Sequence, residues 1–186
     1  MNLKKLIEKV GENAERKGFH KPVTKSEDED KALKKLLIIS EIGEMIEAER
    51  TNNYAKEIHL QEYEVALNTA KDIKEANSIF EKYIKDTYED EMADIIIRMM
   101  DYVYQYENFN IVNYYVLNDI PKVMKNKKYS YLIEIVIFGI EHGIAMQKLL
   151  YTMFEYAKYE NVDIEFFINA KMLFNESREK LHGKKY

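Results

Sequence analysis

The chain has 186 residues, a formal net charge of −5 and a sequence pI near 5.5. This length fits one domain around a single core, so we expect residues 1–186 to form one domain. The acidic balance argues against a nucleic-acid-binding protein, because phosphate contacts usually need a basic face. The absence of cysteine excludes disulfide frameworks, thiolate metal sites and cysteine nucleophiles.

The sequence contains neither a signal-peptide pattern at its N-terminus nor an apolar run long enough to span a membrane. The first residues, Met1–Leu6, alternate apolar and charged side chains and lack the apolar core of a signal peptide. The longest apolar run, Ile135–Ile140, is too short to span a bilayer. The lack of cysteine also fits a reducing compartment. We therefore expect a cytoplasmic protein with no membrane contact.

Glycine and proline are scarce, with six and two residues, which favours an all-α helical bundle over many short strands joined by turns. Apolar spacing predicts a first helix from about Asn2 to Arg16. The next residues, Lys17–Lys25, read as a connection. Ser26 and Glu29 then match a capping box, which would open a long helix that ends near Glu49.

The middle of the chain has a weaker pattern. Ala55–Lys85 is polar and only weakly periodic, which predicts one or two exposed helices or an insertion. Thr87, with Asp90 three positions later, can cap another helix that runs to about Tyr106.

The last third is more apolar. A modest helix is expected to end near Asn118, and Tyr129–Tyr159 reads as one very apolar helix. Asp163 can cap a final helix that extends to about Lys180.

Two acidic residues lie inside an apolar helix. In Leu36–Glu47, apolar residues surround the helix on almost every side, so much of it should be buried. Glu41 and Glu44 are three residues apart and therefore share a face. Neighbouring carboxylates repel, and burying either without a partner is costly. A hard divalent cation would resolve both problems.

The same arrangement recurs in a second helix, where Glu91 and Asp94 are also three residues apart in an apolar run. If the two helices pack face to face, four carboxylates converge into a site suited to Mg²⁺, with Mn²⁺ as a substitute. The alternative for either pair alone is a solvated helix face, because Glu-x-x-Glu is a common helical pattern.

A third group of polar residues lies near the C-terminus. Lys171, Asn175, Arg178 and His182 follow helical spacing along one narrow stripe. Their cationic and amide groups could donate hydrogen bonds to phosphate oxygens. The alternative is the wet face of a terminal amphipathic helix.

At these residues the sequence resembles the MazG-like nucleotide pyrophosphohydrolases of the all-α NTP pyrophosphatase superfamily. Three blocks carry the resemblance, in this order: Ser40–Ala48 with Glu-x-x-Glu, Asp90–Arg98 with Glu-x-x-Asp, and a C-terminal block in which Lys171–Arg178 has Lys-x-x-x-Asn-x-x-Arg and His182–Lys185 has His-Gly-Lys. The resemblance implies cleavage of a nucleoside triphosphate to the monophosphate and pyrophosphate, by a homodimer or a dimer of dimers. Relative to the family's usual spacing, residues 54–85 and 106–155 would be insertions.

These observations predict a role for each group. We expect the two acidic pairs to bind Mg²⁺. A carboxylate on the first acidic helix would accept a proton, and the C-terminal stripe would bind the substrate. The metal ligands would be Glu41, Glu44, Glu91 and Asp94, the proton acceptor Glu44 or Glu47, and the substrate-binding residues Lys171, Asn175 and Arg178. Two alternatives stay open: an enzyme of the dimeric dUTPase or dCTPase type, and a non-catalytic helical module that binds nucleotide or a protein partner.

Overall fold

The computed structural model describes residues 2–21, 26–69, 73–107 and 136–178, and this part of the chain is all-α, as predicted. It holds eight α-helices and one π-helical turn, η1. Their bounds are α1 Leu3–Lys17, α2 Glu27–Arg50, α3 Glu57–Thr69, α4 Ile73–Ile79, η1 Phe80–Ile84, α5 Tyr88–Tyr106, α8 Phe138–Glu141, α9 Met146–Tyr159 and α10 Ile164–Ser177. No helix among the described residues is long and apolar enough to cross a membrane.

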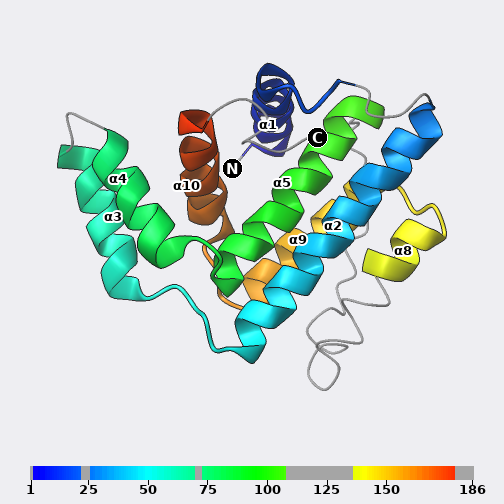
Figure 1. Ribbon diagram of the computed structural model, residues 1–186. Helices are drawn as coiled ribbons and strands as arrows, with labels where there is room; N and C mark the ends of the chain where they lie inside the picture. Colours follow the sequence, from blue (N-terminus) through cyan, green and yellow to red (C-terminus); the bar gives the residue numbers. More distant parts are fainter. Residues whose placement is uncertain (1, 22–25, 70–72, 108–135, 179–186) are drawn as a thin grey trace.

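Helix α5 is the centre of the bundle. It packs against α1, α2, α9 and α10, and Figure 1 shows it between these helices, with α2 beside it and running in the opposite direction. Several of its side chains are completely buried, among them Met92, Ile95, Ile96, Met99, Met100 and Val103. Because α5 is enclosed on most sides, any charged group it carries toward its neighbours is also shielded from water.

The segment predicted to be exposed helices or an insertion forms α3, α4 and η1. Helices α3 and α4 pack against each other and η1, and Figure 1 shows them beside α10, away from α1 and α2. Aromatic pairs connect them to the bundle: Tyr63 meets Phe166 edge-on at 5.9 Å between ring centroids, and Phe80 stacks on Phe174 at 4.8 Å.

Three helix starts follow the predicted caps to different degrees. The Thr87 side chain accepts a hydrogen bond from the Asp90 backbone N–H at 3.4 Å, and Asp163 accepts one from Phe166 at 3.2 Å. Ser26 stands at the N-cap of α2, as predicted, but its side chain makes no capping hydrogen bond. The four acidic residues of the first turn, residues 27–30, still suit the positive end of the helix dipole.

The prediction of one helix over Tyr129–Tyr159 is wrong within the described residues. Helix α8 ends at Glu141 and α9 begins at Met146. Between them Gly143 has a φ of 69°, a left-handed conformation that favours glycine. Its N–H donates to Ile140 O, and the next N–H donates to Gly139 O, which is a helix-ending Schellman pattern. Apolar spacing alone did not reveal this stop.

Two other predicted helices lie at or beyond the limits of the described residues. The final helix ends at Ser177, three residues before the predicted end, and Arg178 is extended with a ψ of 156°. The modest helix expected to end near Asn118 lies outside the described residues, as does most of the second expected insertion.

The packing of α1 on α5 depends on a glycine. A Cβ added to Gly11 would lie 2.1 Å from Cγ of Tyr104 on α5, whereas one added to Gly43 of α2 would meet nothing within 4 Å. We predict that Gly11→Ala lowers the free energy of unfolding by about 1–3 kcal/mol, because the ring must move. Gly43→Ala is the matched control and should raise it by about 0.5–1 kcal/mol through helix propensity.

Urea unfolding of the two variants and the wild type measures both effects. Equal stabilisation by the two alanines would contradict the close approach of α1 and α5.

Candidate functional site

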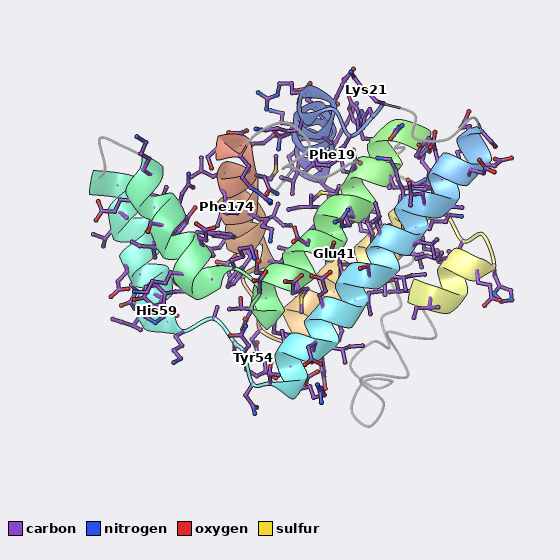
Figure 2. All side chains as sticks on the ribbon, viewed as in Figure 1. Phe19, Lys21, Glu41, Tyr54, His59 and Phe174 are labelled. Atoms are coloured by element: carbon purple, nitrogen blue, oxygen red, sulfur yellow. The ribbon has the colours of Figure 1, made fainter. Side chains whose placement is uncertain are left out.

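Carboxylates from two helices meet where α2 and α5 pack. One oxygen each of Glu41, Glu91 and Asp94 lie within 4.8 Å of one another. Glu41 comes from α2 and is 5% exposed, and Glu91 comes from α5 and is 3% exposed. Figure 2 shows Glu41 between these two antiparallel helices. The structure therefore brings together three of the four residues predicted to bind metal.

The other two glutamates predicted to act from α2, Glu44 and Glu47, are exposed. Glu44 lines the same cavity as the three clustered carboxylates, and its Oε1 accepts a hydrogen bond from Ser40 Oγ at 3.5 Å. Glu47 does not line this cavity, and both of its oxygens accept hydrogen bonds from Arg50 at 2.8 Å. Of the two residues predicted as proton acceptors, only Glu44 faces the space in front of the cluster.

Two cations are already paired with the acidic residues. Arg98 on α5 donates to Glu41 through Nε at 2.6 Å, and its Nη2 lies 2.5 Å from the same oxygen. Lys171 on α10 is 5% exposed, and its Nζ lies 2.7 Å from one oxygen of Asp90 and one of Asp94. Lys171, predicted to bind substrate, therefore has two of its three donors directed at protein carboxylates.

The charges at this site do not balance. Four carboxylates face two cations: Glu41, Asp90, Glu91 and Asp94 against Arg98 and Lys171. When all are ionised, two negative charges remain in excess. Two oxygens, Oδ1 of Asp90 and Oε2 of Glu91, are buried without a hydrogen-bond partner among the described residues. Such a site favours additional positive charge, supplied by protons or by a cation.

The pKa values show the same imbalance. Burial and then the neighbouring Asp94 raise the pKa of Glu91 to about 9. Burial raises the pKa of Asp90 to about 7, although Lys171 opposes the shift. Burial also raises the pKa of Glu41 against the opposing effect of Arg98. For Lys171 burial lowers the pKa, but Asp94 and Asp90 outweigh this effect and the net shift is upward.

A cavity of about 790 Å³ opens in front of these groups, between α1, α2, α5 and α10. All predicted site residues except Glu47 line it: Glu41, Glu44, Glu91, Asp94, Lys171, Asn175 and Arg178. Its volume lies within the usual range for small-molecule sites. Asn175 Oδ1 is buried and has no partner in the described part of the chain, and Arg178 lies over the Phe174 ring, 5.6 Å from its centroid.

Sequence reasoning assigned no role to several residues of this cavity. Arg98 follows Asp94 by four residues, so helical spacing places it on the same face of α5, and this signal was available. The Asp101 carboxylate accepts from Lys34 Nζ at 2.6 Å and lies 2.5 Å from His20 Nε2. This pairing joins residues 67 and 81 positions apart along the chain, and no local pattern indicates it.

Comparison of the chain with protein-family models, with curated proteins and with solved structures gives no match.

The raised pKa of Glu91 predicts a pH-dependent stability. In EDTA the folded protein keeps a proton on Glu91 up to about pH 9, whereas the ordinary value is 4.5. The folded state then binds more protons than the unfolded chain, so the free energy of unfolding falls as the pH rises through this window. Glu91→Gln should make the fall shallower, as measured by thermal unfolding between about pH 5 and pH 9.

The control is Glu64→Gln, on the exposed surface of α3, which should keep the wild-type slope. Identical slopes in all three proteins would contradict the burial of an uncompensated Glu91.

Removing Lys171 should strongly destabilise the protein. Lys171→Met leaves Asp90 and Asp94 without their shared counter-charge, and breaking a buried pair in this way typically costs about 3–5 kcal/mol. Millimolar Mg²⁺ should restore part of the loss, because a bound cation replaces the missing charge. Thermal unfolding in EDTA and in Mg²⁺ measures the loss of stability and its partial recovery. Lys148→Met, on the exposed side of α9, is the control. Equal melting temperatures for the two variants would contradict this role.

Proposed function

We propose that this protein is a Mg²⁺-dependent nucleoside triphosphate pyrophosphohydrolase, which converts an NTP or dNTP to the monophosphate and pyrophosphate. The observation that carries the proposal is the group of Glu41, Glu91 and Asp94, with oxygens within 4.8 Å of one another on the wall of a 790 Å³ cavity. The resemblance of the same helices to MazG-like enzymes supports it. The protein would act in the cytoplasm as a homodimer or dimer of dimers, without nucleic-acid or membrane partners.

The chemistry of the donor set fits the metal. All the candidate donors are carboxylate oxygens, which Mg²⁺ and Mn²⁺ prefer, and the two excess negative charges match a divalent ion. Glu41, Glu91 and Asp94 would hold the metal, with Glu44 at its exposed edge. A bound Mg²⁺ would offset the charge of the triphosphate oxygens and make a nearby water more acidic.

The cations on the cavity wall suit phosphate groups. Arg98 uses only Nε and Nη2 on Glu41 and is one-third exposed, so donors remain for a ligand. Arg178 and the amide of Asn175 line the same wall, from the end of α10. A triphosphate between these groups would have donors on one side and the carboxylate cluster on the other.

The reaction requires a proton acceptor. Water adds to the α-phosphorus, the α–β phosphoanhydride bond breaks, pyrophosphate leaves, and the proton of the water passes to a carboxylate. Glu44 is exposed at the cavity and, among the described residues, receives one long hydrogen bond, from Ser40. Because Glu47 does not line the cavity and is engaged by Arg50, we assign the proton to Glu44.

The test is release of pyrophosphate from a panel of NTPs and dNTPs with Mg²⁺ or Mn²⁺. We predict metal-dependent release that falls by about 10²–10⁴-fold in Glu44→Gln, and by at least as much in Glu91→Gln. The exposed α3 variant Glu64→Gln is the control and should keep wild-type rates. A larger loss in Glu47→Gln than in Glu44→Gln would transfer the proton-accepting role to Glu47.

One observation favours the second candidate, a non-catalytic helical module. Arg98 and Lys171 already pair with three of the four carboxylates, so the cluster has the features of a structural ion-pair network. Absence of pyrophosphate release from every nucleotide in the panel would support this module. A strong preference for dUTP or dCTP would instead identify the closer alternative, an enzyme of the dUTPase or dCTPase type.

A further inference from the structure

One face of α5 lines the cavity from Glu91 near its start to Gln105 near its end. Five of its residues line the wall at alternating steps of three and four: Glu91, Asp94, Arg98, Asp101 and Gln105. With a rise of 1.5 Å per residue, Gln105 lies about 16 Å from Asp94 along the helix. The cavity therefore has a carboxylate end and a distant end, joined by the stretch that contains Arg98.

The distant end differs from the carboxylate end in its charge. Its one α5 carboxylate, Asp101, lies between Lys34 of α2 at 2.6 Å and His20 after α1 at 2.5 Å. The charge of Asp101 is thus balanced by its neighbours, whereas the carboxylates at the other end are in excess. A neutral ligand group suits this end better than a phosphate or a metal ion.

The side chains of this end are held in place by packing. The ring of His20 stacks on Tyr104, with centroids 5.9 Å apart and an interplanar angle of 28°. Tyr104 in turn lies against Gly11, where a Cβ would overlap the ring. These contacts tie the segment after α1 to α5 before any ligand arrives, and such preorganisation lowers the entropy cost of binding.

The distant end also has two aromatic side chains and one unsatisfied acceptor. Phe19 and Tyr106 line the cavity there, and Figure 2 shows Phe19 beside the C-terminal half of α5. Gln105 Oε1 is buried and has no hydrogen-bond partner in the described part of the chain. A buried carbonyl without a donor is unfavourable by about 1–3 kcal/mol, which a ligand N–H would relieve once a rotation of the Gln105 amide brings Oε1 to the cavity.

We propose that this distant end binds the nucleobase, with Gln105 as the residue that determines base preference. The inference rests on the proposed function, because a nucleotide whose phosphates lie at the carboxylates directs its base along α5. The base N–H donates to Gln105 Oε1, and its ring packs on Phe19 and Tyr106. Stacking of a base on an aromatic side chain typically contributes about 1–3 kcal/mol. The sugar and α-phosphate then lie near Arg98.

The experiment measures binding rather than turnover, so that it is independent of the catalytic proposal. Calorimetry with Mg²⁺ compares the four nucleoside monophosphates, ribose 5-phosphate, which lacks a base, and inorganic pyrophosphate. The wild type should bind its preferred monophosphate at least tenfold more tightly than ribose 5-phosphate. Gln105→Leu should remove about tenfold of this difference and leave the affinity for pyrophosphate unchanged.

A matched control comes from α9. Gln147 also has a buried Oε1 without a partner among the described residues, but it does not line the cavity. Gln147→Leu makes the same chemical change and should leave every nucleotide affinity as in the wild type. Thermal unfolding of both variants shows whether each is folded before its affinities are compared.

A gain of preference provides the sharper test. Glutamate at position 105 offers only acceptors, and among the bases guanine alone presents two adjacent N–H donors on its Watson–Crick edge. Gln105→Glu should therefore shift the preference toward GMP by about tenfold or more relative to the other three monophosphates.

The outcomes separate the two proposals. Equal binding of monophosphates and ribose 5-phosphate by the wild type, or unchanged base preference in both Gln105 variants, overturns the base-binding end even if the enzyme releases pyrophosphate. Base-dependent binding that is lost in Gln105→Leu, without pyrophosphate release from any triphosphate, supports the base-binding end and rejects the catalytic proposal.

Discussion

Excess negative charge in the contact between α2 and α5 is the constraint on which the rest of the site depends. A core of this size would normally exclude four carboxylates, because transfer of a charge out of water is costly. Here Arg98 and Lys171 compensate for half of them. The remaining negative charge requires protons or a bound cation. The packing of α2 on α5 therefore depends on what the site binds.

This constraint also explains the arrangement of the other helices. Helix α10 brings Lys171 to the buried Asp90 and Asp94, and its end lines the cavity. Helix α1 lies beside the end of α10, where Lys17 Nζ donates to the carbonyls of Glu176 and Arg178. The cavity wall thus joins four helices, and α5 contacts the other three, α1, α2 and α10.

The all-α class and the starts of α1, α2, α5 and α10 could be predicted, because apolar spacing and caps such as Thr87 are local signals. The break at Gly143 was missed because apolar residues at helical spacing continue before Glu141 and after Gly143, so Glu141 and His142 read as the solvent face of one helix. In the site, the spacing of Glu41, Glu91 and Asp94 was readable from the sequence. Their partners were not, since the contact of Asp90 with Lys171 joins residues 81 positions apart and depends on how the helices pack.

Binding of a divalent cation by the acidic cluster can be measured by Mn²⁺ titration followed by electron paramagnetic resonance. We predict saturable binding of Mn²⁺ to the wild type, competition by Mg²⁺, and loss of the bound signal in Asp94→Asn. Wild-type protein that leaves Mn²⁺ free in solution at millimolar concentration, or an Asp94→Asn variant that binds it equally well, would contradict the account.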